Sequence, residues 1–197
     1  MHNNPHPYQL PIRTRPKNGL FFAVMVPVPE AKRISRLFDG LRTRHTIRKP
    51  QIPCNRLHVS LFHILAADSL PERIVQTSLF TGSAIRFVEF DLTLNRLLTF
   101  RNTQEEKPLV LAADAASSGT TNSLVSQLRQ TFSMLSGLPI GRTAPINPHV
   151  TLVWDHLFVP EQPIPPITLP VREVALVHSH IGKSRYDILG SWRLVPR

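Results

Sequence analysis

Two short segments of the chain each place a histidine and a hydroxyl residue two positions apart. The segments are Leu57–Leu61 and Pro148–Leu152, and both contain histidine, valine, a hydroxyl residue and leucine in that order. Alternate side chains of a β-strand point to the same face, so each segment would aim an imidazole and a hydroxyl group to one side. Brought face to face, two such strands would supply a proton donor, a proton acceptor and two hydroxyl groups for phosphate oxygens. This set of groups suits metal-free chemistry on a phosphodiester.

The pattern gains weight because it occurs twice with the same intervening residues. Of the nine histidines, only His58 and His149 have Ser or Thr two positions later. Two buried strands that each carry an incidental histidine are the alternative interpretation, and it stays open at this point. We expect His63, five residues after His58, to point to the opposite face of an ideal strand.

A second pair of histidines lies near the end of the chain. His178 and His180 would share one face of a strand, as two ligands of a metal site would. The sequence places no further acid or cysteine close to them, and we therefore predict no metal site.

Length and composition predict a globular protein with a basic surface. The chain has 197 residues, of which 42% are hydrophobic, and no apolar run reaches the ~20 residues of a membrane span. The net charge of +10 favours polyanions such as RNA as partners, although a solvated basic surface would have the same composition. Cys54 is the only cysteine, which excludes an internal disulfide and predicts a reducing, cytoplasmic location. Residues 1–18 are expected to form a poorly ordered basic, Pro-rich arm, and residues 19–197 a single bilobal domain.

Hydrophobic periodicity predicts alternating strands and helices. Strands are expected at 19–27, 57–65, 85–94, 96–101, 109–113, 149–154, 171–178 and 186–194, and helices at 29–43, 69–80 with a cap at Ser69, and 122–136 with a stop at Gly137. The Pro-rich stretch 160–170 is expected to be an irregular loop. One histidine strand falls in each half, as in a duplicated unit. We predict an α+β fold of two lobes, with antiparallel sheets facing each other across a central cleft and helices on the outside.

These features together resemble the two-histidine (2H) phosphoesterase superfamily, and most closely the RNA 2′,3′-cyclic phosphodiesterases, also called 2′-5′ RNA ligases. The resemblance covers about residues 19–194. It rests on the strand Leu20–Val24, on both histidine motifs, and on a closing pattern of Leu176, Ser179, Gly182, Tyr186 and Trp192. The first motif has Ser60 where the family's HxTx motif usually has Thr, which preserves the hydroxyl group.

The resemblance implies an enzyme that hydrolyses a 2′,3′-cyclic phosphodiester at RNA or nucleotide ends to a 2′-phosphate, with reverse 2′-5′ ligation as a secondary activity. It implies that His58 is the proton donor, that His149 is the proton acceptor, and that Ser60 and Thr151 bind the nonbridging oxygens. It implies neither a metal ion nor a cofactor. The expected partner is RNA or a nucleotide with a 2′,3′-cyclic phosphate, the expected state is a monomer, and no membrane is involved.

One departure from the family pattern concerns the substrate. Five positions after the second histidine the family commonly has Arg, and this chain has Trp154. The replacement charge is expected from Arg101, Arg142, Lys183 or Arg185, or else the substrate differs. Trp154 and Tyr186 are candidates for stacking on a nucleobase, and core packing is the alternative for Tyr186.

Two other functions remain open from the sequence. The first is a basic RNA- or nucleotide-binding module of the same fold with little turnover. The second is a phosphodiesterase for another 2′-5′ linked or cyclic nucleotide. Measured binding without hydrolysis would indicate the first, and a substrate panel would identify the second.

Overall fold

The computed structural model describes residues 16–101, 105–139 and 144–197. Most of the N-terminal arm expected at 1–18 therefore lies outside the described residues. Within the described ranges no helix combines the length and the apolar character that a membrane span requires.

Eight strands and three α-helices form from these residues. In chain order they are β1 (Asn18–Met25), α1 (Val28–His45), β2 (His58–Ala67), α2 (Glu72–Ala84), β3 (Phe90–Thr99), β4 (Lys107–Ala113), α3 (Ala115–Ser136), β5 (His149–Asp155), β6 (Gln162–Val171), β7 (Glu173–His180) and β8 (Arg185–Arg193). A short 3-10 helix at Cys54–Arg56 leads into β2.

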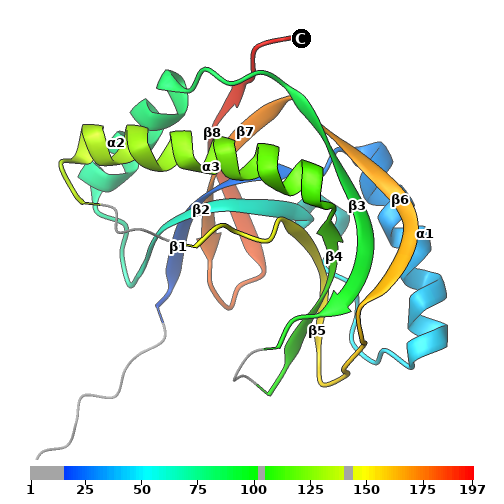
Figure 1. Cartoon of the computed structure of the whole chain (residues 1–197). Coiled ribbons are helices and arrows are strands. Elements are labelled where there is room, and N and C mark those ends of the chain that lie inside the picture. The colour runs from blue at the N-terminus through cyan, green and yellow to red at the C-terminus, as the bar shows by residue number, and fades with distance from the viewer. Residues whose placement is uncertain (1–15, 102–104, 140–143) are drawn as a thin grey trace, which may run out of the picture.

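The strands form one curved antiparallel sheet in the order β6-β3-β4-β5-β2-β1-β7-β8 (Figure 1). Two halves of four strands each meet at its centre, where Val59 of β2 pairs with Val150 of β5. The predicted α+β fold is confirmed, and the two sheets that were expected are the two four-stranded halves of one continuous sheet. The two histidine strands, β2 and β5, lie side by side at the centre of the sheet although they are far apart in the sequence.

Helices cover one face of the sheet and leave the other to a smaller set of side chains. Leu20, Phe22 and Val24 of β1 belong to the large core that also holds buried residues of the helices. The alternate residues Phe21 and Ala23 point the other way and pack in a small cluster with Ala175 and Val177, joined by Met25 and Tyr186. This second face is the one on which the two histidine motifs lie.

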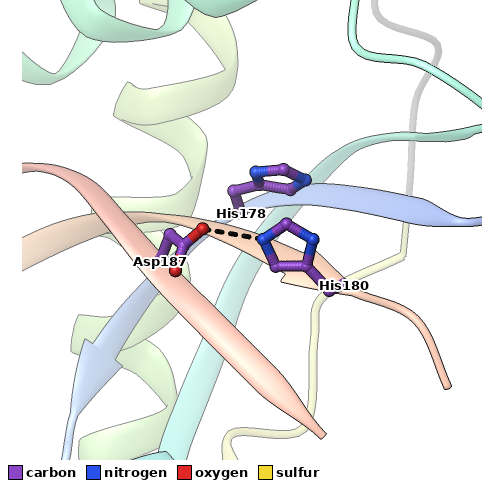
Figure 2. Close-up of side chains that lie close together, drawn as sticks. All are labelled: His178, His180 and Asp187. Carbon is purple, nitrogen blue, oxygen red and sulfur yellow. Dashed lines mark hydrogen bonds and ion pairs between the residues drawn. The ribbon is translucent and has the colours of Figure 1, made fainter. Parts of the chain in front are cut away.

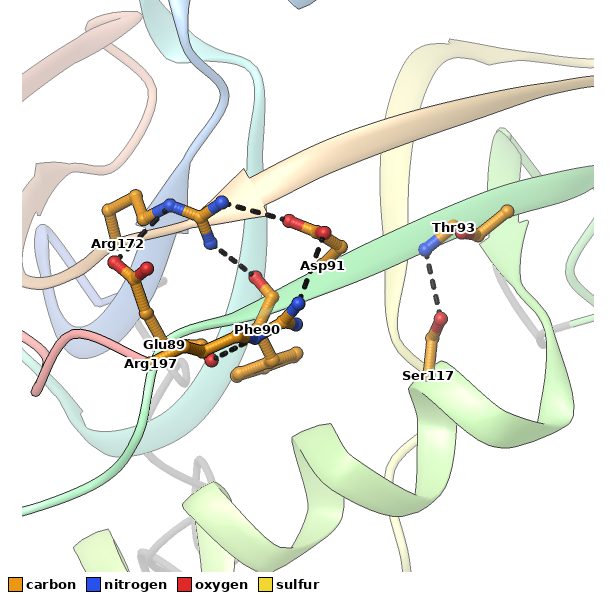
Figure 3. A network of polar contacts seen from close by, with 7 residues as sticks. All are labelled: Glu89, Phe90, Asp91, Thr93, Ser117, Arg172 and Arg197. Atoms are coloured by element: carbon orange, nitrogen blue, oxygen red, sulfur yellow. Dashed lines mark hydrogen bonds and ion pairs between the residues drawn. The ribbon is translucent and has the colours of Figure 1, made fainter.

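An arginine cluster ties the two halves together at a second place (Figure 3). Arg172 lies between β6 and β7, where the chain passes from one half of the sheet to the other. Its guanidinium donates to the carbonyl oxygen of Phe90 at 3.1 Å and pairs with Glu89 at 3.3 Å and Asp91 at 3.1 Å. The C-terminal Arg197 donates to the Glu89 carbonyl at 3.0 Å, so the end of the chain is held at the same point.

Two predicted helix starts are wrong. Helix α2 begins after Pro71, which makes no side-chain capping bond, and Ser69 does not cap it. Helix α3 begins at Ala115 instead of 122, because the Asp114 side chain accepts a hydrogen bond from the Ser117 backbone N–H at 2.7 Å and caps it. The predicted stop is confirmed, since Gly137 has a φ of 70° at the C-cap.

The Pro-rich stretch is also not the irregular loop that was predicted. It forms β6, which lies at the edge of the sheet and pairs only with β3. Proline is tolerated there because an edge strand has one row of N–H groups without a ladder partner. The two strands predicted at 85–94 and 96–101 are a single strand, β3, with a bulge between Leu94 and Arg96.

Candidate functional site

The pairing of Val59 with Val150 brings the four expected catalytic and phosphate-binding groups to one face. Both valines are fully buried. Their neighbours alternate to the opposite face of the sheet, and in an antiparallel register one strand's histidine lies beside the other strand's hydroxyl residue. We call this surface the histidine face; its defining residues are His58, Ser60, His149 and Thr151.

The two imidazoles are held in the same way. His58 Nδ1 donates to the Arg56 carbonyl oxygen at 2.8 Å, and His149 Nδ1 donates to the Asn147 carbonyl oxygen at 2.7 Å. A carbonyl oxygen only accepts, so Nδ1 carries the proton in each neutral ring and Nε2 keeps its lone pair. In the first motif Nε2 lies 3.0 Å from Ser60 Oγ, which donates to it. Each ring is thus fixed in the tautomer in which Nε2 carries the lone pair that can accept a proton.

The two strands share a second feature, a β-bulge three residues after the histidine. In β2, Phe22 pairs with Phe62 and Ala23 pairs with Ser60, so Leu61 is the extra residue. In β5 the register shifts in the same way, and Leu152 is the extra residue. The burial of the six residues from each histidine onward is identical in the two strands. The bulge therefore belongs to the duplicated unit.

The bulge changes which later side chains reach the histidine face. Leu61 and Phe62 are both buried in the core, and the strand then resumes with His63 on the same face as His58. The expectation that His63 points away is wrong because it assumed an unbroken alternation. Trp154, at the equivalent position of β5, lies on the face of His149 and is 41% exposed. Its role in substrate binding stays a prediction.

Aromatic side chains surround the two imidazoles. The Phe21 ring centroid lies 5.3 Å from that of His58 and 5.1 Å from that of His63. Tyr186, a predicted binding residue, contacts His58 edge-on at 5.5 Å. On the other side, Phe100 contacts His149 edge-on at 4.7 Å, an interaction that the sequence analysis missed. These rings pack against the sides of the imidazoles and shield them partly from water.

A cation beside the site comes from a residue that the sequence analysis also missed. The Arg56 guanidinium carbon lies 5.7 Å from the centre of the Tyr186 ring, next to His58. Its signal in the sequence was only its closeness to His58, since Arg56 ends the 3-10 helix that leads into β2.

The cations expected in place of the family's Arg are positioned differently. Arg101 lies over the Phe158 ring at 5.3 Å, and Arg185 binds the Asp187 carboxylate. Lys183 is exposed in the turn between β7 and β8, and Arg142 is outside the described residues.

Burial makes the site unfavourable for positive charge in the absence of a ligand. Desolvation lowers the pKa of His58 from 6.5 to about 4, with smaller contributions from His63, His149 and Arg56, and against the opposing effect of its bond to the Arg56 carbonyl. Desolvation likewise lowers the pKa of His149 and of His63. The ligand-free site therefore holds neutral imidazoles near pH 7, and an anion bound between them would raise their pKa values.

Comparison with known proteins identifies the fold. No protein-family model matches the chain, and no curated protein matches it in sequence. The apo crystal structure of E. coli LigT matches it with a TM-score of 0.65 at 24% sequence identity, over 92% of this chain and 99% of that chain. The chain has the LigT fold.

Two further solved structures support this assignment. The protein TT0787 of Thermus thermophilus matches with a TM-score of 0.65 at 23% identity, over 89% of this chain and 97% of that chain. A crystal structure described as a phosphoesterase matches with a TM-score of 0.62 at 22% identity, over 91% of this chain and 99% of that chain. The resemblance noted in the sequence is thus confirmed for the fold, over nearly the whole length of these proteins.

Proposed function

We propose that this protein is a phosphodiesterase that opens a 2′,3′-cyclic phosphate at the end of an RNA or nucleotide, without a metal ion, and leaves a 2′-phosphate. One observation carries the proposal. Two imidazoles on adjacent strands, each fixed through Nδ1 to a carbonyl two residues earlier, present Nε2 on the same face with a hydroxyl residue beside each. Such an arrangement supports the proposal because an acid and a base would be available to one phosphorus atom.

The proposed reaction assigns one role to each imidazole. His149 Nε2 takes a proton from water, and the oxygen of that water attacks phosphorus. The bond from phosphorus to the ribose 3′ oxygen breaks, and His58 Nε2 gives its proton to that oxygen. Ser60 and Thr151 donate hydrogen bonds to the nonbridging oxygens and hold phosphorus between the two rings. With an RNA 5′ hydroxyl in place of the water, the same displacement of the ribose 3′ oxygen would join two RNA ends through a 2′-5′ bond.

Protonation of the acid depends on the substrate in this scheme. His58 has a pKa of about 4 without ligand, so few molecules carry the required proton near pH 7. The negative charge of the bound phosphate raises that pKa and stabilises the imidazolium where the proton is needed. Arg56, Tyr186 and Trp154 would then hold the rest of the nucleotide, by charge and by stacking. Crystal structures of E. coli LigT with phosphate and with 3′-AMP support a nucleotide ligand for this fold.

The test is hydrolysis of 2′,3′-cyclic AMP in the presence of a metal chelator. His58→Asn and His149→Asn should each lower the rate by about a hundred- to ten-thousandfold. His156→Asn, at an exposed histidine that lies just after β5 and contacts Glu106, is the matched control and should keep the rate. The proposal is wrong if the folded His58 and His149 variants hydrolyse the substrate as fast as the wild type.

A binding module with little turnover is the second candidate. The low pKa of His58 favours it, because a neutral ring cannot act as an acid. Fluorescence titration with an RNA that ends in a cyclic phosphate, measured beside hydrolysis, separates the two. Tight binding without turnover across the range from mildly acidic to mildly basic pH would establish the binding module, and a panel of 2′-5′ linked nucleotides would find an alternative substrate.

A further inference from the structure

A second cluster of histidines lies on the opposite face of the sheet from the histidine face. His178 and His180 of β7 lie beside Asp187 of β8, as Figure 2 shows. His178 pairs with Asp187 across the two strands and with Leu20 of β1, whose side chain is in the large core. Their neighbour Tyr186 points the other way, to His58.

We propose that His178, His180 and Asp187 bind a divalent transition-metal ion, with Zn²⁺ as the best match. One donor atom from each of the three residues lies within 4.8 Å of the other two. The sequence alone predicts no metal here because no acid lies close to the two histidines along the chain, and the β7–β8 pairing supplies the missing carboxylate. Two imidazoles and one carboxylate are a usual ligand set for zinc, with water in the fourth position.

The distances allow coordination with small movements. Bonds of about 2.0–2.1 Å in a tetrahedron separate neighbouring ligand atoms by roughly 3.4 Å. His180 Nε2 donates a hydrogen bond to Asp187 Oδ2 at 2.7 Å, so a proton lies between these two atoms. The ion would replace that proton, and these two atoms would move apart by less than about 1 Å. The ring centroids of His178 and His180 are 4.1 Å apart, so the second imidazole already lies close to the proposed position of the ion.

A neighbouring amide prepares His178 for a metal. Asn18 Nδ2 donates to the Asp68 carbonyl oxygen at 2.7 Å, which turns its oxygen Oδ1 towards His178. His178 Nε2 lies 2.8 Å from that oxygen and must donate to it. The lone pair of the neutral ring is therefore on Nδ1. Histidine ligands of metals usually donate their other N–H to such an acceptor, which fixes the ring and its tautomer.

Arg185 competes with the ion for Asp187. Its guanidinium donates to Asp187 Oδ1 at 2.9 Å and to Oδ2 at 3.0 Å. The Arg185 side chain is 66% exposed, and an exposed ion pair is weak, so the arginine can move into solvent. Removing the arginine should accordingly strengthen metal binding, whereas removing any ligand should weaken it. A cluster that served only as an ion-pair network would show no such opposite response.

The bound ion would join three strands without touching the reaction. It would link β7 to β8 directly and to β1 through Asn18. Those strands carry Tyr186 and Phe21, which contact His58 on the other face. The expected consequence is a more stable sheet, and hydrolysis that proceeds in a chelator.

The test is calorimetric titration of the full-length chain, prepared without a histidine tag, with ZnCl₂. Wild-type protein should bind one equivalent, and the same titration with CoCl₂ should give the visible absorption of four-coordinate Co²⁺. His178→Asn, His180→Asn and Asp187→Asn should each weaken binding by about a hundredfold or more, since changes even one step removed from the metal cost about 10–100-fold. Arg185→Gln should tighten binding several-fold and raise the melting temperature reached with Zn²⁺.

Controls separate this cluster from the other histidines. His63→Phe changes the histidine face, and replacement of both His2 and His6 by Asn removes two further imidazoles; neither change should alter the affinity. Circular dichroism shows that each variant is folded. The proposal is overturned if wild-type protein binds no Zn²⁺ below millimolar concentration, if His63→Phe abolishes binding, or if Arg185→Gln leaves the affinity unchanged or weakens it.

Discussion

Burial of His58 should lower the stability of the protein in mild acid, and His58→Asn should remove the part of that loss which this imidazole causes. The unfolded chain holds this imidazole at its ordinary pKa of about 6.5, and the folded chain at about 4. Between those values the unfolded state binds more protons than the folded state, so the free energy of unfolding falls as the pH is lowered from 6.5 to 4. Below the folded-state pKa the loss is complete.

The size of the effect follows from the two pKa values. Integrating the linkage relation for this one group gives a loss of about 2 kcal/mol between about pH 7 and about pH 5, and about 3 kcal/mol in full. His149 and His63 add losses of the same sign, because their pKa values are also lowered. The contribution of His58 must therefore be isolated by comparing the wild type with a variant that cannot be protonated.

Urea unfolding at about pH 7 and at about pH 5 measures the effect. The difference in unfolding free energy between the two pH values should be about 2 kcal/mol smaller in His58→Asn than in the wild type. His156→Asn, at an exposed position, should leave the difference as it is. NMR titration of the His58 ring provides the direct check, and added inorganic phosphate should move its pKa upward. A midpoint for His58 at about 6 or above in the free protein, or an acid loss that is equally large in His58→Asn, would refute the reasoning.

Two further changes test other features of the structure. His63→Phe keeps an aromatic ring packed on Phe21 but removes a polar group from the histidine face. It should lower kcat/KM for 2′,3′-cyclic AMP about tenfold, while the midpoint of urea unfolding stays within error. An unchanged kcat/KM would show that His63 does not face the substrate. Gly82→Ala in α2 would place a Cβ against the Trp192 ring, too close for both to stay in position, and should lower the free energy of unfolding by about 1–3 kcal/mol. Gly40→Ala in α1 would meet no atom of the described residues within 4 Å and should raise the free energy of unfolding by about 0.5–1 kcal/mol. Equal effects of the two glycine changes in thermal unfolding would contradict the packing of α2 against β8.

The sequence was sufficient for features that depend on local pattern. The two histidine strands, the apolar spacing of α1 and α3, and the stop at Gly137 are determined by side chains within a few residues of one another. The fold class followed from the order of these elements. The side-by-side position of β2 and β5 then came from the family resemblance more than from the residues themselves.

Features that depend on neighbouring strands could not be predicted in this way. The edge position that allows prolines in β6 exists only once β3 is its partner. Asp187 reaches His180 only through the register of the β7–β8 pair. The bulge at Leu61 did leave a trace in the sequence, since Leu61 and Phe62 are two consecutive apolar residues where alternation requires one. The same trace, Leu152 and Val153, is present in β5.

The repeated bulge divides each histidine strand into two groups of positions with different roles in the proposed function. Positions 58 and 60, and likewise 149 and 151, carry the groups to which we assign proton transfer and phosphate binding, and they precede the bulge. Positions 63 and 154 follow it, and they return to the same surface one step further along the strand. If the protein is the enzyme we propose, substitutions at these two positions would change which substrate binds and leave the reacting groups in place. A bulge at this point of the strand would then let substrate specificity change without a change in the reaction.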